Sequence, residues 1–168
     1  MAAEAIKGLS ILELAPNVSG TIGAYVSIGY IAKGSLQFLT AEGTKNNIFV
    51  EELSKAILTS TEEGPMTVSV DSLDVDPVKL TFVFGGTTVA ASGGVGRIWR
   101  APRAVVDKIC ALRITTGTGH ILKVTQLSVF PTFNATITGA DAAKYHISGT
   151  VQNPADGVTE PYSIQYPT

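Results

Sequence analysis

Three aspartates lie close together in the stretch VDSLDVDPV, and carboxylates at this density could bind a hard cation such as Ca²⁺. They are Asp71, Asp74 and Asp76. The glycine and the distal glutamate of an EF-hand loop are missing here. A helix start is the alternative, because Asp76 followed by Pro77 is a typical N-cap and first-turn pair, and carboxylates favour the positive end of a helix dipole. We expect the helix start.

Three arginines, Arg97, Arg100 and Arg103, surround Trp99 at intervals of three, a combination that could contact phosphates or stack on bases. In a regular strand, however, residues three apart point to opposite faces, so the three guanidinium groups could not share one surface. We therefore favour salt bridges between subunits. The candidate partners are the acidic residues of an upstream polar segment: Glu42, Glu51, Glu52, Glu62 and Glu63.

Signals of enzymatic chemistry are scarce. The sequence has no Gly-x-Ser-x-Gly elbow, no Gly-Lys-Ser/Thr phosphate loop, no Cys-x-x-Cys pair and no His-Glu-x-x-His motif. His120 and His146 fall in separate predicted strands without a third ligand, and Cys110 alternates with apolar neighbours like a core residue. The glycines of SGGVGR indicate a turn, because neither a lysine nor a helix pattern follows them. We predict no catalytic residue, no cofactor and no metal site.

The composition predicts a packed β protein that forms oligomers. Of the 168 residues, 45% are hydrophobic, 15% are charged and 17 are glycines, and the mean hydropathy of +0.27 is high for a lone domain. A net charge of −2 gives no general affinity for nucleic acid or anionic membranes. The N-terminal region lacks the basic and apolar parts of a secretion signal, and no long apolar run occurs. We expect a protein without a membrane span that folds in the cytosol.

Alternation of apolar and polar residues predicts strands along most of the chain. The clearest stretches are 24–30, 66–70 and 145–151. In residues 120–130 apolar side chains fall on both faces, which indicates a strand that is central in a sandwich or covered by a neighbouring subunit. Residues 41–64 are polar and rich in turn formers, and they predict an extended loop or projecting hairpin.

Residues 77–84, PVKLTFVF, are different, since they lie between a helix start at Asp76 and a helix stop at Gly85. A helix of about two turns cannot be stable alone, so it must pack on a larger unit. The β-branched and aromatic residues of this stretch are also compatible with a strand, and that alternative stays open.

Several quoted segments together resemble a known family. A polar loop runs into MTVSVDS, then come DVDPVKLTFVFGG and a late KYHISGTVQNPADG. This layout resembles the tail tube (major tail) proteins of tailed bacteriophages and related injection machines. The resemblance implies one domain over residues 1–168. Its fold is mainly β, a β-sandwich or barrel-like tail tube fold with an N-terminal arm at about 1–20, one short flanking helix and a long projecting loop at about 41–64.

The resemblance also implies a function. Subunits of such proteins form six-membered rings, the rings stack into a hollow tail tube in the virion, and DNA passes through the lumen without specific binding. The implied partners are further copies of the chain and the tape measure, terminator and baseplate or tip proteins, and the chain would be made in the host cytoplasm. Helix packing would involve Leu80, Phe82 and Phe84. The assembly interface would include Glu42, Lys45, Ile48, Phe49, Glu51, Glu52, Arg97, Arg100 and Arg103.

Three alternatives remain. A carbohydrate-binding or adhesin-type β-sandwich would use exposed aromatic residues to stack on a ligand, with Tyr25, Trp99, Tyr162 and Tyr166 as candidates. Another virion part, such as a tail terminator, head-tail connector or decoration protein, would have a similar architecture. An enzyme is the third, and no nucleophile and base pair can be located for it.

Overall fold

The structure, a computed structural model, describes residues 7–48, 58–104, 107–134 and 143–167. Within these ranges the chain is mainly β, barrel-like and flanked by a single short helix, which confirms the predicted fold class. The elements are β1 (Leu9–Val18), β2 (Thr21–Ile22), β3 (Val26–Ser27), β4 (Gln37–Thr40), β5 (Thr44–Ile48), β6 (Leu58–Glu62), β7 (Met66–Ser72), α1 (Pro77–Phe84), β8 (Thr87–Val89), β9 (Ile98–Arg100), β10 (Lys108–Thr116), β11 (Ile121–Asn134), β12 (Lys144–Val151) and β13 (Tyr162–Gln165).

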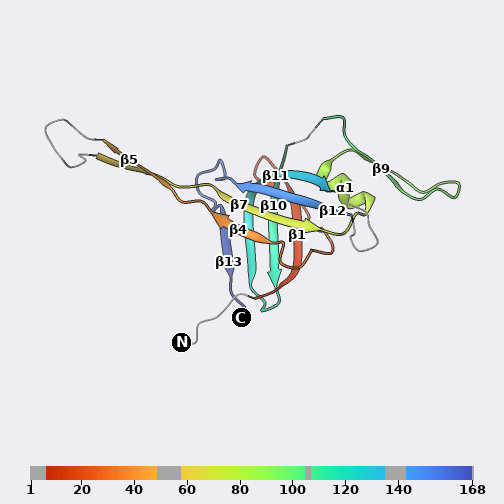
Figure 1. Cartoon of the computed structure of the whole chain (residues 1–168), viewed down its shortest axis with the longest axis horizontal. Helices are drawn as coiled ribbons and strands as arrows, with labels where there is room; N and C mark the ends of the chain where they lie inside the picture. Colours follow the sequence, from red (N-terminus) through yellow and green to blue (C-terminus); the bar gives the residue numbers. More distant parts are fainter. Residues whose placement is uncertain (1–6, 49–57, 105–106, 135–142, 168) are drawn as a thin grey trace.

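One antiparallel sheet forms the body, with the strand order β2-β1-β10-β11-β12-β7-β4, while β3 pairs with β1 and β13 pairs with β11 (Figure 1). The segment between β3 and β4 connects the two sides of this sheet. The amide of Ile28 donates to the carbonyl of Leu12 in β1 at 3.1 Å, and the amide of Ala32 donates to the carbonyl of Asp71 in β7 at 2.9 Å. These bonds draw the sheet into its barrel-like form.

The core lies on the inner face of the curved sheet, because alternate residues of each strand point inward. Its most deeply buried side chains come from β1, β7, β10, β11 and β12: Leu12, Leu14, Val68, Val70, Leu112, Ile114, Val124, Leu127, Val129, Tyr145 and Ile147. The alternation predicted for residues 66–70 and 145–151 is confirmed by β7 and β12. β11 pairs with β10, β12 and β13 and so lies inside the sheet, as expected in the first of the two alternatives given for residues 120–130.

Two sequence-based expectations need correction. Residues 9–18, placed by prediction in an N-terminal arm at about 1–20, belong to β1, which pairs with β10 and buries Leu12, Leu14 and Ala15. Residues 1–6 of the predicted arm lie outside the described residues. The expected strand 24–30 is reduced to Val26–Ser27. Gly29 has a φ of 82°, which interrupts the alternation, and Tyr30 beyond it is 80% exposed.

Residues 77–84 form a helix, so the strand alternative for them is wrong. The Oδ1 atom of Asp76 accepts a hydrogen bond from the amide of Val78 at 2.8 Å, and the amide of Gly85 donates to the carbonyl of Thr81 at 2.9 Å. These caps satisfy backbone groups that the ends of a helix would otherwise leave unpaired. The sequence signals at both ends therefore outweighed the strand propensity of the residues between them.

The helix packs on the core through one side. Leu80 and Val83 are buried, and Phe82 and Phe84 are partly buried against the core cluster. The ring of Phe84 lies 5.8 Å from that of Tyr145 in β12, measured between centroids. α1 therefore covers one flank of the body.

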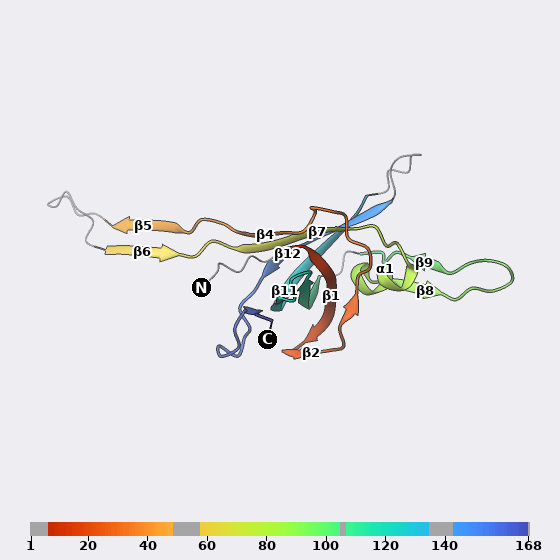
Figure 2. The same ribbon diagram turned by 90° about the horizontal axis from the view of Figure 1, so that it is seen from below.

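Two hairpins project from opposite ends of the body, as both ribbon views show (Figures 1 and 2). The first consists of β5 and β6, paired from Thr44 opposite Glu62 to Ile48 opposite Leu58. The second consists of β8 and β9, paired from Thr87 opposite Arg100 to Val89 opposite Ile98. Residues 41–64, predicted to be a loop or a projecting hairpin, thus contain a hairpin.

Candidate assembly surfaces

The described part of the β5–β6 hairpin has an acidic, exposed base. Glu42, Glu62 and Glu63 are exposed, and Lys45 is the exposed cation beside them. The segments that connect the hairpin to β4 and β7 approach closely here, because a Cβ atom at Gly64 would lie 2.1 Å from the carbonyl oxygen of Ala41. A glycine at this position therefore fixes where the hairpin leaves the body.

Further residues predicted to lie in the assembly interface belong to this hairpin. Ile48 ends β5 opposite Leu58, as predicted for a projecting segment. Phe49, Glu51 and Glu52 lie outside the described residues.

The three arginines belong to the second hairpin and its C-terminal flank, and all three are exposed. Arg100 lies in β9 opposite Thr87. The Nη1 atom of Arg97 is 3.9 Å from the Oδ2 atom of Asp76, which is the outer limit of an ion pair, and the Arg97 side chain remains 57% exposed. The arginines are thus accessible to a partner.

Trp99, between two of these arginines, has a different role from the one considered for it. Its Nε1 atom donates a hydrogen bond to the carbonyl of Gly85 at 3.0 Å, and its ring centroid lies 5.6 Å from that of Phe84. The indole therefore anchors β9 to the end of α1. This anchoring makes it a poor platform for stacking a base or a sugar.

A polar cluster on the outer face of the sheet was missed by the sequence analysis. Asp71 in β7 accepts from the Nζ atom of Lys144 at 3.0 Å and lies 2.6 Å from the Nδ1 atom of His146, both in β12. The cluster borders a shallow groove of about 360 Å³ that is also lined by Ser35, Gln37, Ser69 and Asn134. The alternation within each strand predicted that Asp71 and His146 lie on polar faces. It could not predict that β7 pairs with β12.

The pKa of Asp71 reflects these contacts. Burial alone would raise it, but the hydrogen bonds from His146 and Lys144 outweigh burial and hold the pKa below its usual value. The carboxylate is therefore ionised at neutral pH and joins the two strands electrostatically.

The other two aspartates serve the helix start. Asp74 contacts the Nζ atom of Lys79, and its Oδ1 atom accepts from the amide of Asp76 at 3.3 Å. Since Asp71 pairs with groups of β12, the three carboxylates have separate partners. Within the described ranges, no group of three or more His, Cys, Asp or Glu side chains is placed to hold a metal ion.

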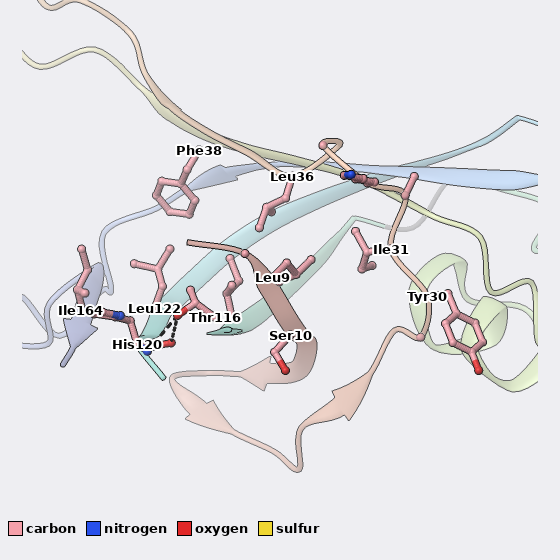
Figure 3. A pocket seen from close by; sticks show the side chains of 16 residues that line it. Leu9, Ser10, Tyr30, Ile31, Leu36, Phe38, Thr116, His120, Leu122 and Ile164 are labelled. Atoms are coloured by element: carbon pink, nitrogen blue, oxygen red, sulfur yellow. Dashed lines mark hydrogen bonds between the residues drawn. The ribbon is translucent and has the colours of Figure 1, made fainter. Parts of the chain in front are cut away.

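A cleft of about 720 Å³ opens between β1 and the segment that leads into β4 (Figure 3). Leu9 lines one side, and Ile31, Leu36 and Phe38 line the other. His120 lies at one end, 1% exposed, in the turn between β10 and β11 and not within a strand as predicted. The Oγ1 atom of Thr118 lies 2.8 Å from its Nδ1 atom, so this imidazole is held by its own turn.

The single cysteine is a core residue, as its alternation predicted. Cys110 is a free thiol, 5% exposed. Burial raises the pKa of the thiol, and the positive charge of Lys108 offsets this rise only in part. The reactive thiolate is therefore disfavoured.

Three aromatic residues besides Trp99 were considered as ligand-stacking platforms. Tyr25 is half-buried, and the guanidinium carbon of Arg113 lies 4.2 Å from its ring centroid and so occupies one face of the ring. Tyr166 is 58% exposed but packs edge-to-face on His120 at 5.2 Å, and Tyr162 is 42% exposed in β13. The aromatic residues are therefore not gathered into one open platform.

Comparison with known proteins adds no assignment. The sequence matches no known protein family, and no curated protein shows significant similarity to it. In the described part of the chain, no helix has the length and hydrophobicity that crossing a membrane requires.

Proposed function

We propose that this chain is a structural virion protein that self-assembles into hexameric rings, stacked as the hollow tail tube of a phage or phage-like particle. The observation that carries the proposal is the β5–β6 hairpin, which extends from a barrel-like β body flanked by one short helix (Figures 1 and 2). A long hairpin with an exposed polar base contributes little to its own domain, so its natural role is contact with another molecule.

Open strand edges support lateral association of subunits. At one end of the strand order, β4 pairs with β7 on one side, and among the described strands no other strand pairs with it. An unpaired edge exposes backbone donors and acceptors that a neighbouring subunit can satisfy. Closed ring symmetry would use such edges without leaving a free one.

Exposed apolar side chains on the body also fit a subunit interface. They include Ile11, Ile22, Leu39, Ile109, Phe130, Tyr162 and Ile164, each between 39% and 58% exposed. Covering them in an oligomer would remove apolar surface from water. The proposal also fits the net charge of −2, because a neutral or slightly acidic lumen would not retain DNA.

In this proposal the subunit has no catalytic role. Its partners are further copies of itself and the tape measure, terminator and baseplate or tip proteins, and DNA passes through the lumen.

Negative-stain electron microscopy of the purified full-length protein over a concentration series tests the proposal. We expect six-fold rings or hollow tubes that become longer as concentration rises. A variant without residues 43–60 tests the hairpin. Because the amide of Ala41 donates to the carbonyl of Pro65 at 3.0 Å, the base of the hairpin can close without its outer part. This variant should stay folded but form no stacked rings.

Small dispersed particles at every concentration would contradict the tube proposal. That result would favour a binding module or a virion part, such as a terminator or decoration protein, that needs a scaffold. Long tubes from the deletion variant would contradict the role of the hairpin alone.

A further inference from the structure

The two projecting hairpins carry opposite charge. Residues 41–64, which include β5 and β6, contain five glutamates and two lysines, whereas residues 85–104, which include β8 and β9, contain three arginines and no other charged residue. The hairpins lie at opposite ends of the long axis (Figures 1 and 2). The two hairpins are therefore oppositely charged, although the net charge of the chain is only −2.

The arginine end is held in a fixed position. Trp99 anchors β9 to α1 through its hydrogen bond to the carbonyl of Gly85. At Gly86, whose φ is +85°, a Cβ atom would lie 2.1 Å from the carbonyl oxygen of Arg100, so the backbone of the two segments is in close contact there. A charge held on a fixed backbone can select a partner orientation at a lower entropy cost than one on a free loop.

The charges at both ends are available. The Arg97 side chain is 57% exposed, and its Nη1 atom lies 3.9 Å from the Oδ2 atom of Asp76 in the same subunit. Arg100 and Arg103 are also exposed. At the other end, Glu62 and Glu63 are exposed. Exposed guanidinium groups are well suited to bind carboxylates of another molecule by paired hydrogen bonds.

We propose that the β8–β9 arginines dock onto the acidic base of the β5–β6 hairpin of a second copy of this chain, in a head-to-tail contact. A two-fold contact between identical ends would bring like charges together, whereas a head-to-tail contact brings opposite charges together. Such a contact extends along one axis when its rotation does not close a ring. The inference deepens the proposed function, on which it relies for the ring, by naming the contact between stacked rings.

Charge reversal in the full-length chain tests this contact. One variant carries Arg97→Glu and Arg100→Glu, a second carries Glu62→Lys and Glu63→Lys, and a third combines all four changes. Sedimentation velocity measures self-association, and electron microscopy records the shape of the assemblies. We expect about tenfold or weaker association for each of the first two variants, and recovery in the third, because the reversed charges again attract.

The matched controls are a Lys33→Glu and Lys123→Glu variant and an Asp107→Lys and Glu160→Lys variant, which change the net charge as much as the two test variants do, at exposed residues outside both hairpins. They should associate like the unchanged protein. Raising the ionic strength from about 0.05 M to about 0.5 M should weaken association of the unchanged protein, because salt screens exposed charges. Far-UV circular dichroism confirms that each variant is folded.

The inference would be overturned by association that the first two variants leave unchanged, or by a loss that the variant with all four changes does not recover. Equal loss in the controls would also overturn it, since net charge would then be the cause. Failure of the proposed function is distinguishable. Charge-dependent association without rings or tubes would support the head-to-tail contact and contradict the tail tube, whereas tubes insensitive to the reversals would do the opposite.

Discussion

The Nδ1 atom of His146 lies 2.6 Å from the Oδ1 atom of Asp71, and the two residues are direct partners across β12 and β7. Lys144 contacts the other carboxylate oxygen from the same strand at 3.0 Å. The Asp71 side chain is only 21% exposed. One carboxylate thus connects two side chains of the neighbouring strand on the outer face of the sheet.

This connection makes stability depend on pH in the acid range. The folded state holds the pKa of Asp71 below its ordinary value of 3.8, so near that pH the unfolded chain binds a proton that the folded chain does not. Stability from this group is therefore complete above the unfolded pKa and is lost as the pH falls through the folded pKa. We expect Asp71→Asn to lower stability at neutral pH by about 1 kcal/mol and to flatten the decline between about pH 5 and pH 2.

Chemical denaturation at a series of pH values measures this effect. Asp107→Asn is the matched control, because Asp107 is an exposed aspartate before β10. The control should keep the acid decline of the unchanged protein. An equally steep decline in Asp71→Asn would mean that other carboxylates cause it.

The Asp71 cluster also shows where sequence reasoning ends. Alternation correctly predicted β7 and β12 as strands, and it assigned Asp71 and His146 to polar faces. Nothing in the local sequence states that these strands are neighbours or sets their register, because pairing between residues 75 positions apart depends on the whole sheet. The position of each side chain on its strand was predictable, and the contact between them was not.

The helix, in contrast, was predictable from local signals alone. Asp76, Pro77 and Gly85 define its ends through hydrogen bonds within a few residues. Which side packs on the core was less clear. Val83 is 2% exposed and belongs to the core cluster, yet the packing residues predicted from the sequence were Leu80, Phe82 and Phe84.

Truncation of the buried side of α1 tests how strongly it holds the flank of the body. Leu80 is 5% exposed, whereas Val78 in the same helix is 51% exposed. We expect Leu80→Ala to lower the free energy of unfolding by about 2–4 kcal/mol, because it removes buried methyl groups and leaves a cavity. Val78→Ala should change it by less than about 0.5 kcal/mol.

Thermal and urea denaturation of both variants provide the comparison. Similar small losses in the two would place the Leu80 side chain in solvent and contradict the packing of α1 on the core.

Gly29 illustrates a limit of alternation as a guide. Residues 24–30 alternate like a strand, but a φ of +82° at Gly29 turns the chain so that it can cross from β1 to β7. A glycine in an alternating stretch does not by itself reveal whether its backbone is extended or left-handed. The crossing is therefore a property of the tertiary structure.

Two alanine substitutions separate the backbone conformation of Gly29 from its surroundings. Gly34 has a similar φ of +77°, and a Cβ atom there would have no neighbouring atom within 4 Å, while a Cβ atom at Gly29 would lie 2.1 Å from Oδ2 and 2.5 Å from Cβ of Asp74. Gly34→Ala should cost about 1 kcal/mol for the left-handed backbone alone. Gly29→Ala should cost about 2–4 kcal/mol, because Asp74 must also move away from Lys79 and the amide of Asp76. Urea denaturation measures both, and equal losses would show that Asp74 yields without cost and that the crossing tolerates a side chain at Gly29.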